Sequence, residues 1–242
     1  IRQRLNMVIN WARGRGLFTG EDPIKMAELS LPKTKQSKNH FKSLNYDEMP
    51  SLFEEIEASS ATIQAKLSLQ FTILTCCRTT EVLNSNWVEI DLVKAIWTIP
   101  AERMKAGEPH SVSLSSGAIN ILEKANGLRA DSGLIFPSSI DNKPMSDGTM
   151  RKLLQKTLGI DATVHGFRST FKDWAAETTN HSNEVSEMAL AHTISSKTGA
   201  AYRRGDLIHK RRKLMEDWSN FLCSGQKKII RLKKVAAYGR HA

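Results

Sequence analysis

The sequence is poor in cysteine, and this excludes two classes of small stabilised domain. It has three cysteines in 242 residues, and two of them, Cys76 and Cys77, are adjacent within an apolar run. Such a set forms neither a disulfide framework nor a C-x-x-C metal site. A reducing, intracellular environment is therefore the default expectation.

Long apolar runs are also missing. No stretch approaches the ~18 consecutive apolar residues that are typical of a membrane span, and no signal-peptide hydrophobic core follows residues 1–4. We therefore expect no membrane partner. Because the first residue is Ile1 rather than methionine, we expect the chain to be a fragment.

Acidic residues are fewer than basic ones. The chain has 25 Asp plus Glu against 35 Lys plus Arg, a formal net charge of +10. This excess suits an anionic polymer as partner, although charge alone decides little because many soluble proteins are basic. The length is sufficient for one good core, or for one domain plus part of another.

Hydrophobic periodicity predicts a mainly α-helical chain with a small antiparallel β-sheet. Residues 1–16 have the pattern of an amphipathic helix, and the polar, aperiodic stretch 22–38 indicates a linker. Helices are expected over 47–57, over 61–74 and from 146 onward. Alternation predicts strands at 93–99 and 110–114, with 134–136 as a short third candidate. Apolar faces are expected on two late helices, at Phe167, Phe171, Trp174 and Ala175, and at Leu214, Met215, Trp218, Phe221 and Leu222.

Six residues have the chemistry of one phosphate-handling site. They are Arg78, Lys105, His165, Arg168, His192 and Tyr202. A phosphodiester gains negative charge in its transition state, so a site that attacks it needs fixed donors. A tyrosine can be the nucleophile if cations stabilise that charge and an acid protonates the leaving oxygen. This scheme requires no metal and no cofactor.

The two arginines suit this chemistry because a guanidinium presents parallel N–H groups to phosphate oxygens. His165 and Arg168 are three residues apart, so on the first turn of a helix they share a face with unpaired backbone N–H groups. Structural alternatives stay open for all six residues. Arg78 could pair with Glu81, Arg168 with Asp173 or Glu177, and His192 could cap helix 185–190. Lys105 could be a solvated turn lysine, His165 a cap or core residue, and Tyr202 a tyrosine that packs on a helix face.

The order and spacing of these residues resemble the tyrosine recombinases, the phage integrase family, over residues 44–222. Within it the chain looks most like integrases of prophages and genomic islands. Arg78 lies in the run T-C-C-R-T-T-E, where an acidic residue follows the arginine by three, and Lys105 precedes a hairpin strand. The run H-G-F-R at 165–168 and A-H at 191–192 complete the pattern. The sequence departs from it at Cys76-Cys77, where many relatives have a small residue such as glycine.

The resemblance implies a tyrosine-recombinase catalytic domain fold and a role for each residue. Tyr202 would attack the scissile phosphorus and form a 3′-phosphotyrosine, His165 would take its proton, and Lys105 would be the general acid for the leaving 5′ oxygen. Arg78, oriented by Glu81, would bind phosphate oxygens with Arg168, and His192 would donate to one. Residues 1–36 would be a remnant of the core-binding DNA domain, 37–225 the catalytic domain, and 226–242 a basic tail.

The function implied is site-specific DNA recombination for integration and excision of a mobile element. Its expected partners are double-stranded DNA at attachment sites, further copies forming a homotetramer on DNA, and accessory directionality or DNA-bending proteins. The expected location is the bacterial cytoplasm, associated with the nucleoid. Three alternatives stay open: a type IB topoisomerase, an inactive DNA-binding relative, and a basic helical RNA-binding domain, for which no aromatic-rich strand motif is found.

Overall fold

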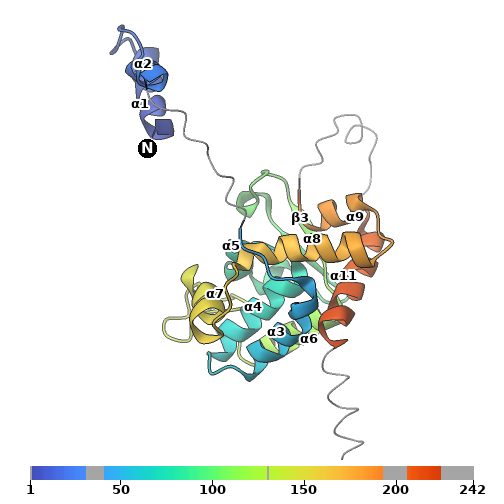
Figure 1. Cartoon of the computed structure of the whole chain (residues 1–242). Helices are drawn as coiled ribbons and strands as arrows, with labels where there is room; N and C mark the ends of the chain where they lie inside the picture. Colours follow the sequence, from blue (N-terminus) through green and yellow to red (C-terminus); the bar gives the residue numbers. More distant parts are fainter. Residues whose placement is uncertain (1, 31–40, 130, 193–205, 225–242) are drawn as a thin grey trace, which may run out of the picture. The chain divides into compact units, whose positions relative to one another are not determined.

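A computed structural model describes residues 2–30, 41–129, 131–192 and 206–224 of the chain (Figure 1). The chain divides into two compact units, residues 1–40 and 41–242. In the described residues, no helix is both long enough and apolar enough to cross a membrane. The predicted basic tail, 226–242, lies outside the described residues.

The first unit contains two helices, α1 (Arg2–Gly14) and α2 (Pro23–Ser30). The predicted helix over 1–16 is confirmed, but the linker prediction is wrong over α2. The Asp22 carboxylate accepts hydrogen bonds from the backbone N–H groups of Ile24, at 3.0 Å, and Lys25, at 3.4 Å. Pro23 occupies the first helical position, where its missing N–H has no effect. An acidic cap and a proline thus start a helix in a stretch that lacks apolar periodicity. The assignment of residues 1–36 to a core-binding domain stays a prediction.

The core of the second unit is built around α4 (Ile63–Thr75), with α3 (Met49–Ala58), α6 (Ser116–Asn126) and α11 (Ile208–Leu222) against it. From Leu67 to Thr75 every residue of α4 is buried, as expected of a central helix. The indole N–H of Trp218, on α11, donates to the backbone carbonyl of Ile73 at 2.9 Å. The helices predicted over 47–57 and 61–74 are confirmed within two residues.

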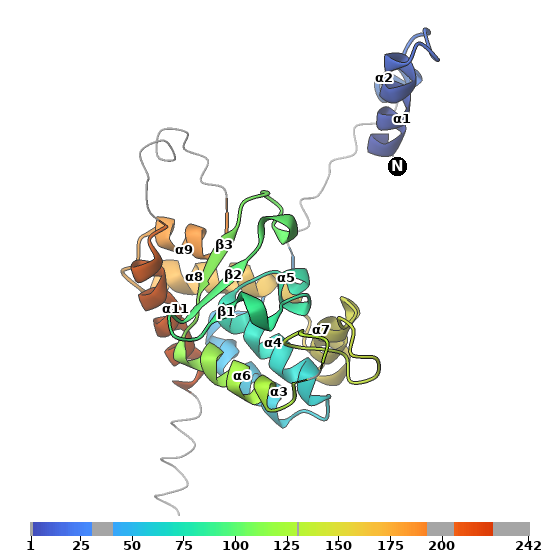
Figure 2. The same cartoon turned by 180° about the vertical axis from the view of Figure 1, so that it is seen from behind.

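The sheet has three antiparallel strands in the order β1 (Ile90–Asp91), β2 (Ile96–Ile99) and β3 (His110–Ser113), side by side in Figure 2. The strands predicted within 93–99 and 110–114 are confirmed, and Ile99 pairs with His110. The third strand predicted at 134–136 is wrong. Leu134 forms an isolated bridge to Asn86, and Ile135 and Phe136 are buried in the core without joining the sheet ladder.

Residues after 146 are helical over most of the described part, as predicted, with loops at 158–163 and 179–182. They form α7 (Gly148–Lys152), which runs into a π-helical turn, then α8 (Phe167–Thr178) and α9 (Asn183–Ala189). Trp174 on α8 packs on Trp218 of α11, with ring centroids 4.9 Å apart. The two predicted apolar faces therefore meet. The expected class, mainly α with a small antiparallel sheet, is confirmed.

Short elements complete the second unit. Helix α5 (Thr79–Leu83) follows α4 directly. Single 3₁₀ turns lie at Tyr46–Glu48, Trp87–Glu89, Ala101–Arg103 and Val164–Gly166. The last of these leads into α8, and the third lies in the connection between β2 and β3. Both therefore carry or adjoin residues singled out by the sequence.

Candidate active site

Five of the six predicted residues line one pocket of about 580 Å³. Arg78, Lys105, His165, Arg168 and His192 lie on it together with Glu187. They come from the start of α5, the β2–β3 connection, the turn before α8, α8 itself and the end of α9. Tyr202 lies in 193–205, outside the described residues. A larger pocket, of about 880 Å³, lies between the end of α8 and α11 and contains none of the predicted residues.

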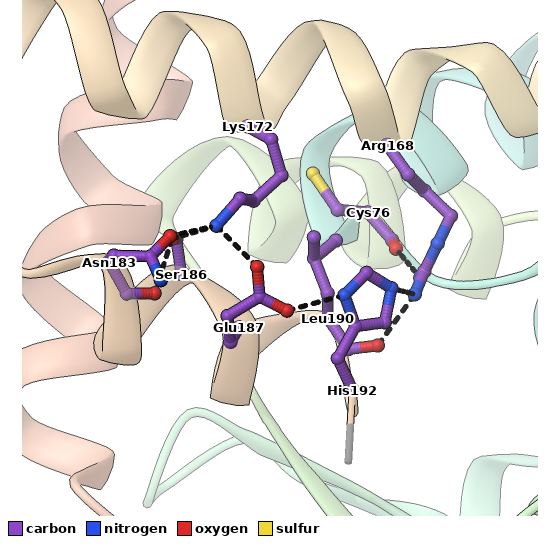
Figure 3. Close-up of polar contacts among 8 residues, drawn as sticks. All are labelled: Cys76, Arg168, Lys172, Asn183, Ser186, Glu187, Leu190 and His192. Carbon is purple, nitrogen blue, oxygen red and sulfur yellow. Dashed lines mark hydrogen bonds and ion pairs between the residues drawn. The ribbon is translucent and has the colours of Figure 1, made fainter. Parts of the chain in front are cut away.

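Arg168 is buried and joins the C-terminal ends of two helices (Figure 3). One Nη atom donates to the backbone carbonyl of Cys76, which ends α4, and the other donates to that of Leu190, which ends α9, at 2.6 Å. Both carbonyls belong to the groups that a helix leaves unpaired at its C-terminus. The predicted alternative, a surface ion pair with Asp173 or Glu177, is therefore wrong.

The backbone turns sharply at both of these helix ends. Cys76 has φ +54° and Ala191 has φ +50°, both in the left-handed region that favours glycine. This explains why a glycine suits the position of Cys76, two residues before Arg78. Burial raises the pKa of Cys76 well above its ordinary value and that of Cys77 to about 12, so neither thiol forms a thiolate readily.

Burial also lowers the pKa of Arg168, and the positive charge of Arg78 lowers it further. An arginine nevertheless keeps its proton in proteins, so the buried cation persists at neutral pH. Its charge is compensated by the carbonyl dipoles of two helix C-termini, which carry partial negative charge. A cation held in this way is a fixed donor that needs no rearrangement when an anion arrives.

Arg78 is oriented by Glu81, three residues later. The Glu81 carboxylate accepts from the backbone N–H of Arg78 at 2.8 Å and from its Nη1 at 2.6 Å. Glu81 is 4 % exposed, whereas the side chain of Arg78 is 26 % exposed. The ion pair that the sequence left open is therefore present. The Arg78 side chain, held through Nη1, also lines the pocket.

His165 lies in the 3₁₀ turn before α8, with its ring 4.5 Å from that of Phe41. Its pKa is lowered by partial burial, then by the charges of Arg168 and Arg78 and by His192. The imidazole is therefore neutral at pH 7 and can accept a proton. Phe41 lies far from His165 in sequence, and no pattern in the sequence predicts this contact.

Gly166 lets the chain cross the start of α8. The segment 41–45 runs over it, and a Cβ built on Gly166 would lie 2.2 Å from the carbonyl oxygen of Lys42. That carbonyl accepts from the backbone N–H of Thr163 at 2.9 Å, and the carbonyl of Leu44 accepts from the Thr170 hydroxyl at 2.7 Å. The glycine between His165 and Arg168 is therefore required by close backbone approach.

Lys105 is exposed in the connection between β2 and β3, and the two residues before it are held in place by packing and hydrogen bonds. Met104, beside it, is buried, and Arg103 donates to the carbonyl of Glu81 at 3.1 Å and pairs with Glu89. Two other lysines near it in the sequence are paired elsewhere, Lys94 with Asp91 at 2.9 Å and Lys124 with Glu57 at 3.2 Å. Among the lysines of the described residues, Lys105 alone lines this pocket.

A chain of charges that joins the pocket to Lys172, shown in Figure 3, was not predicted from the sequence. Lys172 lies 2.5 Å from Glu187, and Glu187 lies 2.7 Å from Nδ1 of His192. Nε2 of His192 lies 3.1 Å from Nη2 of Arg168. One signal was present, because Lys172 follows Arg168 by four residues and so shares its helix face. Glu187, five residues before His192, had no comparable signal.

Comparison with known families agrees with the motifs. The model of the phage integrase family matches residues 42–207. Prophage integrase IntA of Escherichia coli K12 is 31 % identical, covering 98 % of this chain and 58 % of that protein. The integrase of Enterobacteria phage P4 is 26 % identical, covering 96 % of this chain and 56 % of that protein. The chain thus spans little more than half the length of these relatives.

Comparison with solved structures gives matches over most of the chain. A lambda integrase (75–356) dimer bound to a COC′ core site has a TM-score of 0.57 at 18 % identity, covering 81 % of this chain and 71 % of that one. The integrase from mycobacterium phage Brujita has a TM-score of 0.55 at 16 % identity, covering 89 % and 69 %. At these identities the likeness shows the fold, and it confirms the predicted integrase catalytic fold.

Proposed function

Because the chain belongs to the phage integrase family, we propose that it is the catalytic part of a site-specific DNA recombinase of the prophage integrase type. It would cleave one DNA strand at a time and rejoin it to another through a 3′-phosphotyrosine. The observation that carries this proposal is the convergence of Arg78, Lys105, His165, Arg168 and His192 on one pocket. These residues are far apart in sequence and come from five separate segments.

The proposed cleavage step transfers one phosphoryl group, from the 5′ oxygen to the tyrosine, and two protons. The hydroxyl oxygen of Tyr202 attacks phosphorus as the bond from phosphorus to the 5′ oxygen breaks. A phenol has a pKa near ~10, so it needs a base, and neutral His165 accepts its proton. Lys105, which is exposed and lines the pocket, gives a proton to the leaving 5′ oxygen. Rejoining reverses these transfers with the 5′ hydroxyl of another strand as nucleophile.

The negative charge that develops on the phosphate would be stabilised by the two arginines. Arg168 is fixed by the ends of α4 and α9, and Arg78 by Glu81, so both are oriented before DNA binds. Preorganised donors of this kind are usually the largest single contribution to such catalysis. His192 would complete the phosphate contacts. The phosphotyrosine conserves the energy of the broken bond, so the proposal requires neither ATP nor a metal.

The proposed partners follow from charge and family. The net charge of +10 suits double-stranded DNA at attachment sites. The lambda integrase structure similar to this chain is a dimer on a core site, and we propose that this chain acts as a homotetramer on two recombining sites. We also propose accessory directionality or DNA-bending proteins as partners, a DNA-binding role for residues 1–36, and a location at the bacterial nucleoid.

Covalent capture of DNA tests the proposal without requiring a defined attachment site. The 242-residue chain is incubated with a pool of nicked duplexes whose central sequence is randomised. Adducts that survive denaturing detergent are isolated, and their DNA is sequenced. We expect enrichment of one family of sequences joined to the protein through Tyr202. Absence of any adduct, with DNA binding intact, would indicate an inactive DNA-binding relative.

The matched control is Tyr202→Phe, which removes only the hydroxyl oxygen. We expect it to bind the selected DNA with nearly unchanged affinity and to form no adduct. A normal amount of adduct would refute the assignment of Tyr202. Reactions on two selected sites then separate the remaining alternative, because strand-exchange products support recombination whereas relaxed circles alone indicate a type IB topoisomerase.

A further inference from the structure

Glu187 and His192 form two hydrogen bonds with each other at the end of α9, one between backbone groups and one between side chains. The backbone N–H of His192 donates to the carbonyl of Glu187 at 3.0 Å, and that of Ala191 donates to the carbonyl of Met188 at 3.2 Å. With Ala191 in the left-handed region, this is the Schellman arrangement of a helix C-terminus. In that arrangement an apolar contact commonly joins the two outer positions. Here the contact is polar, between the Glu187 carboxylate and Nδ1 of His192, at 2.7 Å.

The two nitrogens of the His192 ring face partners of opposite kinds. An ionised carboxylate can only accept hydrogen bonds, and a guanidinium can only donate them. Glu187 at Nδ1 therefore requires a proton on Nδ1, and Arg168 at Nε2 requires a lone pair on Nε2. Both conditions are met by the same neutral tautomer. Its proton position is thus determined from both sides of the ring.

Lys172 holds the Glu187 carboxylate in place. Its ammonium group contacts the side chains of Asn183, Ser186, at 3.0 Å, and Glu187, at 2.5 Å, so its three N–H donors each have an acceptor on α9 (Figure 3). Partial burial opposes ionisation of Glu187, but hydrogen bonds from Lys172 and His192 outweigh it, and the pKa of Glu187 is lowered. The carboxylate is therefore ionised at neutral pH and remains an obligate acceptor.

We propose that Glu187, anchored by Lys172, is a positioning residue that keeps the His192 proton on Nδ1 and thereby aims the ring nitrogen Nε2 at Arg168. This inference deepens the proposed function of the same pocket and rests on it. In this proposal Glu187 acts through His192 and not directly on the DNA or the reacting atoms. The ring then fixes the third contact of the Arg168 guanidinium, after the two helix-end carbonyls.

The arrangement has a consequence for His192 itself. As placed, Nε2 is an acceptor, so His192 can donate to a phosphate oxygen only after the ring gains a second proton there. The Glu187 carboxylate is the anion in contact with that ring, at 2.7 Å from Nδ1.

The simpler explanation is that Lys172 and Glu187 only tie α8 to α9. Nuclear magnetic resonance of the chain labelled with ¹⁵N-histidine separates the two explanations, because the nitrogen shifts report which ring nitrogen carries the proton. His192 is assigned by its absence from a His192→Asn spectrum. We expect the wild-type ring to carry its proton on Nδ1. In Glu187→Gln we expect a mixture of tautomers, because an amide can present either an oxygen or an N–H group.

The matched control for this measurement is Glu57→Gln, which removes a carboxylate from the pair with Lys124 on the surface. It should leave the His192 signals unchanged. A wild-type ring protonated on Nε2 would overturn the proposal. An unchanged Nδ1 proton in Glu187→Gln would overturn it as well, since the carboxylate would then not determine the tautomer. This measurement needs no DNA, so it is interpretable even if the chain forms no adduct.

A double-mutant cycle tests the link to chemistry. We expect Glu187→Gln to slow adduct formation by about 10- to 100-fold, by analogy with the loss of an outer-shell partner of a metal-bound histidine. In a His192→Ala background the same substitution should cost nothing further, because its effect passes through the ring. Independent losses that multiply in the double variant would reject the positioning role and leave a structural tie. Absence of adduct in the wild type would instead refute the proposed function.

Discussion

Replacing Gly166 by alanine should destabilise the second unit and disturb the pocket together, although it adds only one methyl group. The new Cβ would lie 2.2 Å from the carbonyl oxygen of Lys42 and 2.9 Å from its carbonyl carbon. Both are backbone atoms, so no side chain can rotate away. The segment 41–45 or the turn at 164–166 has to move instead.

The size of the effect follows from what holds these two segments together. The oxygen has to retreat by about 1.2 Å to reach the 3.4 Å of an ordinary contact. That movement strains the two hydrogen bonds from Thr163 to the carbonyl of Lys42 and the one from Thr170 to that of Leu44. At about 1 kcal/mol each, their loss lowers the free energy of unfolding by roughly 2–3 kcal/mol. For a unit of this size the melting temperature should fall by about 4–12 °C.

Urea denaturation and thermal melting measure this change, with Gly127→Ala as the matched control. Gly127 ends α6 with φ −63°, and its added Cβ meets only the Lys124 carbonyl, at 3.5 Å. The control should be neutral or slightly stabilising, because alanine restricts the unfolded chain. Adduct formation by Gly166→Ala should also fall, since His165 moves with the turn. If Gly166→Ala is as stable as the control, the close approach of segment 41–45 is wrong.

Three further predictions concern the pocket and its surroundings. Arg78→Ala or Arg168→Ala should slow cleavage by about 10²–10³ with a much smaller loss of DNA binding, because each removes a transition-state donor; equal losses would indicate ordinary backbone contacts. Cleavage should continue undiminished in excess EDTA, since the pocket cations already supply positive charge; a need for added magnesium in the chemical step would contradict this. Burial lowers the pKa of His110 from 6.5 to about 4, so between these values the unfolded chain binds a proton that the folded chain does not. Stability should therefore fall by roughly 3 kcal/mol as the pH drops from 6.5 to 4, and denaturant titrations of His110→Gln should lack that part of the loss.

Much of the fold could be predicted from the sequence because the spacing of apolar residues matches the helix faces that are buried in the core. The apolar residues of 61–74 and the spacing of Phe167, Phe171 and Trp174 predict helices whose faces are indeed buried. Predictions failed where local chemistry overrode the pattern. Asp22 and Pro23 start a helix in a polar stretch, and Ile135 and Phe136 are buried without joining the sheet.

The composition of the pocket was also accessible from the sequence, because each residue type has chemistry that is largely independent of its surroundings. Arginines with parallel donors, a histidine three residues before one of them, and a lysine before a hairpin strand are enough to suggest a phosphate site. The acidic residue three positions after Arg78 likewise predicts the ion pair with Glu81. Such short-range relations depend on helix geometry alone.

Five of the side chains that line the pocket were thus predictable from the sequence, whereas the contacts that hold them depend on the tertiary structure. Arg168 is fixed by carbonyls at the ends of α4 and α9, and these come from residues 92 and 22 positions away. Every residue has a backbone carbonyl, so no sequence motif predicts which of them will accept a hydrogen bond from Arg168. The same holds for Phe41 against His165 and for the Lys172–Glu187–His192 chain. These contacts join segments that only the packing of the helices brings together, and packing is a property of the whole chain.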